Sequence, residues 1–140
     1  MAFPPNASKL AAYRSTSAHA GVAAADPHRL IVMLMDGALE RIAAARGLLS
    51  HGGGGGEKAQ LLQRAVAIID ELRNSLNVKA GGTVAANLDA LYEYMGMRLV
   101  QANASNKPEW LDEVSRLLNE IRSAWLALPA QGRAQVAQSP

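Results

Sequence analysis

Few residues of this chain have the types and spacing that catalysis or metal binding requires. The three histidines, His19, His28 and His51, lie far apart along the 140 residues. Di-iron sites in helical proteins need inward-facing Glu residues together with Glu-x-x-His pairs, and no Glu-x-x-His occurs in the sequence. We therefore expect no metal site, and we expect the histidines to cap helices or to face solvent.

One glycine-rich run superficially resembles a phosphate-binding loop. Gly52–Gly56 is followed by Glu57 and Lys58, whereas a P-loop needs Gly-Lys-Ser/Thr after a strand. Here Glu57 intervenes and a helical pattern precedes the run, so we interpret it as a turn. No Ser/His/Asp constellation can be argued either, because Asp36 and Asp89 fall at outward helical positions where solvated charges are expected. The sequence therefore predicts a protein that is not an enzyme and uses no cofactor.

Composition and charge narrow the classes of partner. Hydrophobic residues make up 49% of the chain and aromatic residues only 4%. Ala and Leu dominate, which favours helices over strands. The formal net charge is +2, and the Lys and Arg residues are scattered singly, with no interleaved aromatics. This pattern argues against a nucleic-acid partner.

The expected location is the cytoplasm. The chain has no cysteine, so disulfides and thiolate metal sites are excluded and a reducing compartment is compatible. No apolar run approaches the ~20 residues of a membrane span. The amino terminus, MAFPPNASK, has no hydrophobic core of a signal peptide. We therefore expect no direct membrane insertion.

The methionines say more about a binding surface than the histidines or the acidic residues do. Met33 and Met35 lie in one helical pattern, and Met95 and Met97 lie in another. Flexible, polarizable Met side chains fill gaps in cores, and they also recur on surfaces that accept varied apolar guests. Met95 falls in a core register. Met35 and Met97 do not, so a packing role and a binding role are equally open for them.

The stretch Gly81–Asn103 must position the second pair of methionines. Its apolar residues recur three and four apart, as one face of a helix requires: Val84, Leu88, Leu91, Met95, Leu99 and Ala102. Thr83 can cap the start. A second apolar stripe lies on the outer side: Ala86, Ala90, Tyr94 and Met97. One stripe suffices for a core, so the second indicates a surface that binds something else.

The helix that carries Met33 and Met35 shows the same surplus. It starts at Asp26-Pro27, an acidic cap followed by proline at the first helical position, and it ends at the glycine run. Its core stripe comprises Leu30, Ile31, Leu34, Ala38, Ile42, Ala45 and Leu49. Its second apolar row comprises Val32, Met35, Leu39 and Ala43.

Two further amphipathic helices complete the predicted fold. Glu57–Leu76 carries Leu62, Ala65, Ile69, Leu72 and Leu76, and the helix opened by Pro108 carries Leu111, Val114, Leu118, Ile121, Trp125 and Leu128 before Pro129. We predict an all-α protein, an antiparallel up-and-down four-helix bundle over residues 26–129. Residues 1–25 are expected to form a mobile arm with a short helix, and residues 130–140 a disordered tail.

Four segments, taken together, resemble a known family. They are DPHRLIVMLMDGALE, AVAIIDELRNSLN, GGTVAANLDALYEYMGMRLVQAN and LDEVSRLLNEIRSAW, and in this order and spacing they are similar to the FliS-type flagellar secretion chaperones. The resemblance implies a cytosolic chaperone that binds the carboxy-terminal segment of flagellin, prevents its premature polymerisation and aids its delivery to the flagellar type III export gate. It also implies that Leu10 and Tyr13 match an amino-terminal element that occupies part of the flagellin site when the chaperone is empty.

The surplus apolar rows are the predicted client surface. We expect the flagellin segment to contact Val32, Met35, Leu39, Leu72, Leu76, Asn87, Ala90, Leu91, Tyr94, Met97 and Asn103. Asn87 and Asn103 could bond the client's backbone or a neighbouring helix. A rival hypothesis remains open, in which the extra rows mediate weak self-association of a small structural bundle without an export role.

Overall fold

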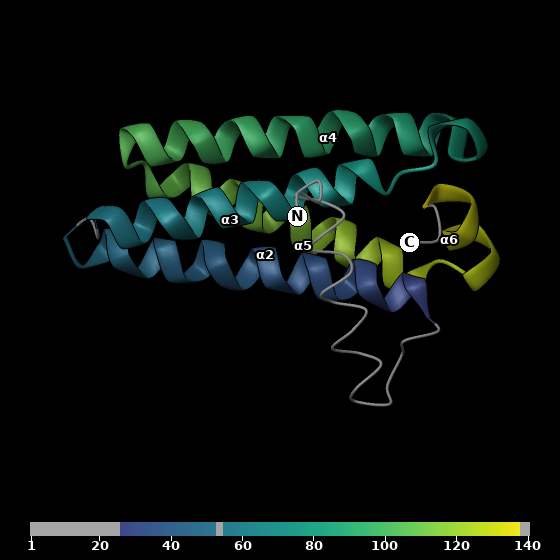
Figure 1. The fold of residues 1–140 in the computed structure, drawn as a ribbon, viewed down its shortest axis with the longest axis horizontal. Helices are drawn as coiled ribbons and strands as arrows, with labels where there is room; N and C mark the ends of the chain where they lie inside the picture. Colours follow the sequence, from purple (N-terminus) through teal and green to yellow (C-terminus); the bar gives the residue numbers. More distant parts are fainter. Residues whose placement is uncertain (1–25, 53–54, 138–140) are drawn as a thin grey trace, which may run out of the picture.

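The computed structural model describes residues 26–52 and 55–137, and every regular element within them is a helix (Figure 1). The helices are α2 (Pro27–Ser50), α3 (Gly55–Asn74), α4 (Val78–Ser105), α5 (Pro108–Ala127) and α6 (Ala130–Val136). The all-α class predicted from the sequence is confirmed for these residues. The predicted arm, with Leu10 and Tyr13, lies outside the described residues.

Proline marks where two of the long helices begin. Asp26 Oδ1 accepts a hydrogen bond of 3.1 Å from the backbone N–H of His28, and Pro27 opens α2. Pro108 opens α5, but Lys107 before it makes no side-chain capping hydrogen bond. After α2 the chain turns at Gly52, whose φ of +109° suits a residue without a Cβ atom. Both helix starts predicted from proline are therefore confirmed.

α4 begins earlier than the sequence predicts. The side chain of Asn77 accepts a hydrogen bond of 3.1 Å from the backbone N–H of Ala80, so helix starts at Val78, where a turn is expected. Gly82 then departs from helical geometry with φ of +55° and kinks the helix. Thr83, the predicted cap, lies exposed just beyond this kink. The cap at Asn77 and the tolerance of Gly82 for positive φ let two helical segments join without a separate turn.

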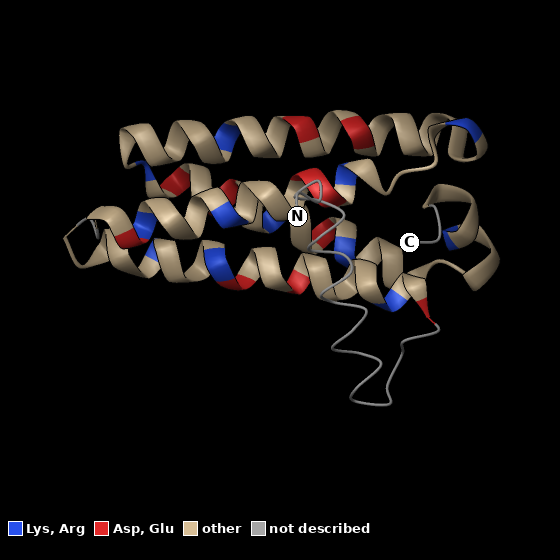
Figure 2. Cartoon of the chain, viewed as in Figure 1, with Lys and Arg blue, Asp and Glu red and all other residues tan. Residues whose placement is uncertain are grey.

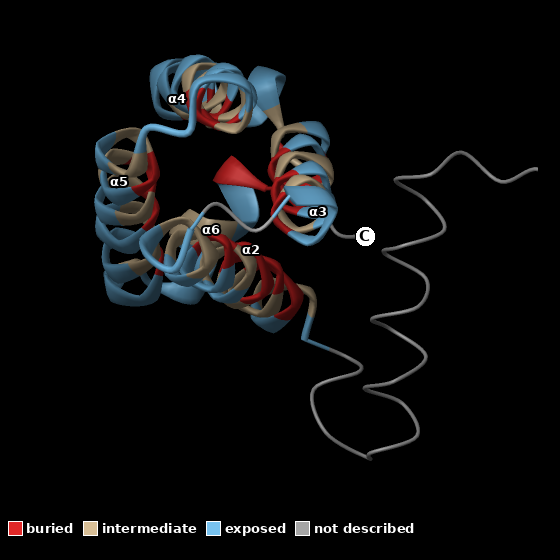
Figure 3. Cartoon of the chain, turned by 90° about the vertical axis from the view of Figure 1, so that its left-hand side faces the viewer, coloured by how far each residue is buried: buried red, intermediate tan, exposed pale blue. Residues whose placement is uncertain are grey.

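The four long helices surround one core. α2 packs against α3 and α5, α3 packs against α4, and α4 packs against α5. Figure 3 looks along these helices and shows their buried sides turned inward. In Figure 1 each long helix runs opposite to the one before it. The seam between α4 and α5 is the most sparsely packed of the four.

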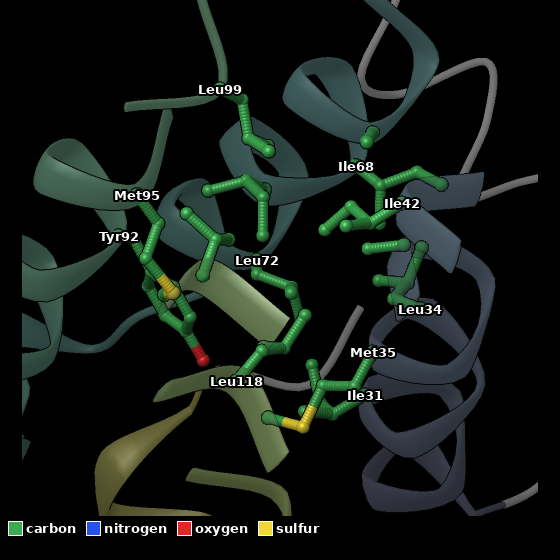
Figure 4. Close-up of a cluster of buried hydrophobic side chains, with 14 of the residues drawn as sticks. Ile31, Leu34, Met35, Ile42, Ile68, Leu72, Tyr92, Met95, Leu99 and Leu118 are labelled. Carbon is green, nitrogen blue, oxygen red and sulfur yellow. The ribbon is translucent and has the colours of Figure 1, made fainter. Parts of the chain in front are cut away.

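The core draws on every long helix, and Figure 4 shows part of it. One member corrects a prediction: Met35, assigned to a surplus row, is fully buried. α2 lies between α3 and α5, so residues on both of its apolar rows meet a neighbour. The two apolar rows of α2 therefore form one wide buried face, which leaves little apolar surface free to bind another molecule.

Charged residues are spread over the helices (Figure 2), and some of them form ion pairs between neighbouring helices. Asp36 on α2 lies 2.7 Å from Arg122 on α5. Asp89 on α4 lies 2.7 Å from Arg73 on α3, and this guanidinium lowers the pKa of the Asp89 carboxyl. The two carboxylates expected to be simply solvated therefore each pair with a guanidinium from a neighbouring helix.

The carboxy-terminal segment differs from the disordered tail expected for residues 130–140. Residues Ala130–Val136 form α6, which packs against α4. Val136 and Ala137 are both buried, and an isolated β-bridge joins Leu76 to Ala137. This segment is polar in composition, but its one large apolar side chain, Val136, is enough to pack a short helix against α4. The expectation of disorder is wrong for residues 130–137.

Candidate functional site

The sparse seam between α4 and α5 holds an apolar groove of about 320 Å³. α4 contributes Val84, Leu88 and Leu91, α5 contributes Leu117, Glu120, Ile121, Ala124, Trp125 and Leu128, and α6 contributes Val136. Nine of these ten side chains are apolar, and the exception is Glu120. We call this set the α4–α5 groove. Its size and lining are typical of a site that takes an apolar ligand or segment.

Two side chains of the groove are unusually exposed for their type. Val84 is 53% exposed and Leu91 is 36% exposed. Both were predicted to lie in the core stripe of α4. Met95, Leu99 and Ala102 of that stripe are buried as predicted, but earlier in the helix the buried side chains are Ala85 and Tyr92, each one position after a predicted one. The groove lies where Val84, Leu88 and Leu91 face the loosely packed α5.

A polar cluster follows the groove one turn further along both helices. The Tyr94 hydroxyl donates a hydrogen bond of 2.9 Å to the Glu113 carboxylate, and Arg98 Nε donates to the same carboxylate at 3.1 Å. The Arg98 guanidinium also lies 4.7 Å from the centre of the Trp110 ring. We call these four residues the Tyr94 cluster. They tie α4 to α5 just beyond Leu91.

The Tyr94 cluster also fixes the charge of its carboxylate. The hydrogen bond from Tyr94, followed by that from Arg98, lowers the pKa of Glu113. A carboxylate that accepts such bonds is held ionised. The end of the apolar groove therefore carries a fixed polar boundary, and an apolar guest would have to stop there or pass over it.

The opposite end of the groove is formed by Trp125 and α6. The indole N–H of Trp125 donates a hydrogen bond of 3.3 Å to the carbonyl of His28 on α2. The His28 ring lies 5.9 Å from the indole ring. These contacts hold the large ring in place, so Trp125 serves as a fixed wall of the groove. Val136 from α6 completes this end.

The residues predicted on α2 and α3 do not form a free surface. Met35, Leu72 and Leu76 are buried in the core, and Val32 and Leu39 are half-buried and packed against it. Contacts from Met35, Leu72 and Leu76 to a client would need the helices to separate. The predicted residues on α2 and α3 are thus occupied by the protein's own packing.

The residues predicted on α4 lie on three different parts of that helix. Leu91 lines the groove, and Tyr94 belongs to its polar boundary. Met97 is 52% exposed, and Ala90 and Asn87 are exposed as well.

Asn103 is placed differently from the other predicted residues of α4. It lines a smaller pocket of about 290 Å³ between α3 and α4, together with Leu62, Gln63, Val66, Leu99 and Val100. Its carbonyl accepts a hydrogen bond of 2.8 Å from Lys58 Nζ. Lys58 is on α3, so this bond serves the contact between α3 and α4.

Sequence reasoning missed most of the groove because it placed those residues in the core. Leu88, Ile121, Trp125 and Leu128 have core spacing, and nothing in a period of three and four separates a sealed stripe from an open one. Val136 was missed because a lone valine in a polar segment gives no periodic signal. Within the described residues no group of three or more His, Cys, Asp or Glu side chains could hold a metal ion. The described helices are each too short or too polar to cross a membrane.

The sequence is similar to proteins of one known family. A family model described as Flagellar protein FliS matches residues 9–132. The flagellar secretion chaperone FliSB of Pseudomonas aeruginosa is 50% identical over 113 residues, which cover 81% of this chain and 89% of the relative. The flagellar secretion chaperone FliS of Salmonella typhimurium is 42% identical over 120 residues, or 85% and 88% of the two chains. That of Vibrio cholerae is 38% identical over 122 residues, or 87% and 89%.

Proposed function

This chain belongs to the flagellar protein FliS family, and on that premise we propose that it is a flagellar secretion chaperone whose client is the carboxy-terminal segment of flagellin. Its relatives are named flagellar secretion chaperones, which is not an enzyme class. In this proposal the protein works in the cytoplasm, holds flagellin unpolymerised and helps to deliver it to a component of the flagellar type III export gate. Binding alone carries this function.

The α4–α5 groove is the observation that carries the proposal. A flagellin segment that is apolar on one side would lay that side into the groove, as helices do in other apolar grooves. Fully burying a Val or Leu side chain is worth about 1.5 to 3 kcal/mol. Covering half-exposed Val84 and partly exposed Leu91 would therefore contribute about 1 kcal/mol each. An unfolded client loses conformational freedom when it binds, and this loss opposes binding. Many such apolar contacts are therefore needed to give a stable complex.

The groove is also a better client surface than the predicted rows of α2 and α3. We keep Leu91 and the exposed α4 residues Asn87, Ala90 and Met97 as proposed contacts, with Tyr94 at the boundary and Asn103 at the α3–α4 pocket. Val84, Leu117 and Ile121 join them. Val32 and Leu39 remain proposed only at the edge of the surface, since they are half-buried.

The finer architecture belongs to the same proposal. We infer that α2 to α5 act as an antiparallel up-and-down four-helix bundle, which the packing of each long helix on two others supports. We also infer that residues 1–25 form an arm whose Leu10 and Tyr13 occupy part of the client surface when no flagellin is bound. In that case the arm lowers the apparent affinity by the fraction of chaperone that is open.

Calorimetric titration with a peptide of flagellin's carboxy-terminal segment tests the proposal. We expect a stoichiometric complex and a negative heat-capacity change, the mark of apolar burial. Lack of binding would refute the proposed client. Light scattering addresses the rival hypothesis of self-association: a structural bundle would form dimers without the peptide, whereas a chaperone would form a one-to-one complex when the peptide is added.

A further inference from the structure

α6 lies across the kinked start of α4 and approaches it very closely. At Gly81 a Cβ atom would come within 3.1 Å of the Gln135 carbonyl oxygen and 3.3 Å of the Val136 Cα atom. A side chain at this position would require α6 to shift by a few tenths of an ångström, so glycine suits the close contact. The seat of α6 is therefore built into the backbone of α4. In Figure 1 α6 sits at the end of the molecule where α4 begins.

Few bonds hold α6 in this seat. The backbone N–H of Asn77 donates a hydrogen bond of 2.8 Å to the Val136 carbonyl, and the bridge between Leu76 and Ala137 lies beside it. The helix has seven residues and no side-chain cap at its start. A helix of this length is not stable by itself in water, so its order depends on the burial of Val136 and Ala137.

The seat of α6 and the α4–α5 groove are continuous. Val136 lines the groove and is at the same time the apolar anchor of α6. If α6 leaves, the groove loses one wall and becomes longer. The buried side chains of Leu76 and Ala85, which lie next to the seat, would then be uncovered. One valine thus couples the position of α6 to the length of the groove.

We propose that residues 130–137 form a detachable strap that competes with the client for the end of the α4–α5 groove. This inference rests on the proposed function of the groove. In the closed state Val136 occupies the end of the groove. In the open state a client side chain takes the place of Val136, and the client backbone or a small residue passes Gly81. The strap therefore selects clients that carry a branched aliphatic residue beside a small one.

A reversible lock tests the strap. Leu76 and Ala137 face each other in an antiparallel bridge, a geometry whose Cα separation of about 4.5 to 5.5 Å suits a disulfide. The chain has no cysteine of its own, so this bond is the only disulfide possible within one molecule of the full-length Leu76→Cys/Ala137→Cys variant, and the monomer is isolated after oxidation. We expect the oxidised protein to bind the flagellin peptide about tenfold more weakly than the same protein after reduction. Each state serves as the control for the other.

A second variant opens the strap. Val136→Asp places a charge where an apolar anchor is buried, which should release α6. Ala134→Asp adds the same charge at an exposed position of the same helix and is the matched control. We expect Val136→Asp to bind the peptide more tightly than the wild type and to bind more of the dye 8-anilinonaphthalene-1-sulfonate, while Ala134→Asp changes neither.

The outcomes separate the strap from the proposed function. Equal peptide affinity in the oxidised and reduced states would overturn the strap and leave the chaperone proposal intact. Failure of the disulfide to form would overturn the seating of residues 130–137. If the peptide binds none of the variants in any state, both proposals fail.

Discussion

Tyr94 shows how a single residue can be apolar in pattern and polar in role. Its ring falls in the outer stripe predicted for α4, yet its hydroxyl donates to Glu113 on α5. Sequence spacing identified its position on the helix but could not identify Glu113 as its partner. The residues 94 and 113 meet only because α4 and α5 lie side by side.

The Tyr94 cluster should make stability depend on pH. The Glu113 pKa is lowered in the folded protein, first by the Tyr94 hydroxyl and then by Arg98. The corresponding stability is present above the carboxyl's pKa in the unfolded chain, about 4, and is lost as pH falls through the lower folded pKa. We expect Tyr94→Phe to melt at a lower temperature near neutral pH and to differ less from the wild type in acid. In a Glu113→Ala background, which lacks the acceptor, the substitution should have little effect, and an undiminished effect there would contradict this assignment.

Methionines 35 and 97 have the same side chain in opposite environments. Met35 is fully buried, whereas Met97 is 52% exposed. We expect Met35→Ala to lower the free energy of unfolding by about 2 to 5 kcal/mol, because it leaves a cavity. Met97→Ala should change it by less than about 0.5 kcal/mol. Urea denaturation measures both, and comparable losses would mean that one of these placements is wrong.

At the scale of elements, the two helix starts marked by proline were easier to predict than the width of buried faces. Pro27 and Pro108 act through local chemistry, which the sequence contains in full. How much of a helix is buried depends on how many neighbours it has: α2 has one on each side and buries Met35, while α4 meets α5 loosely and leaves Val84 exposed. The periodic pattern predicted a core face for each long helix, but it predicted neither these differences nor the burial of Ala85 and Tyr92 in place of Val84 and Leu91 on α4.

Gly81 and Gly96 provide a matched pair on α4. A Cβ atom at Gly96 would meet nothing within 4 Å, whereas one at Gly81 would crowd the Ala85 Cβ atom at 2.6 Å and the backbone of α6. We expect Gly96→Ala to stabilise the protein by about 0.5 to 1 kcal/mol, because alanine favours helix. Gly81→Ala should destabilise it and speed hydrogen exchange in residues 130–137. Unchanged exchange there would contradict the close seating of α6.

At the scale of the whole molecule, the ring of helices explains both a closed core and an open seam. The seam between α4 and α5 is the most sparsely packed of the four, and it holds the apolar groove. The sequence predicted surplus apolar rows on both α2 and α4, but it assigned Val84, Leu88 and Leu91, which line the groove, to the core stripe of α4. It could not predict that the surplus lies between α4 and α5, because that depends on the distance between two packed helices.

The central claim is that the α4–α5 groove receives the flagellin segment, and paired charge substitutions test it most directly. Val84→Asp/Leu91→Asp places two carboxylates in the groove, at positions already exposed. Leu126→Asp, at a leucine that is 49% exposed and outside the groove lining, is the control. Titration with the flagellin peptide should show affinity reduced about 30-fold or more by the double substitution, equivalent to at least 2 kcal/mol, with circular dichroism unchanged and the control binding like the wild type. Wild-type affinity in the folded double variant would contradict the claim.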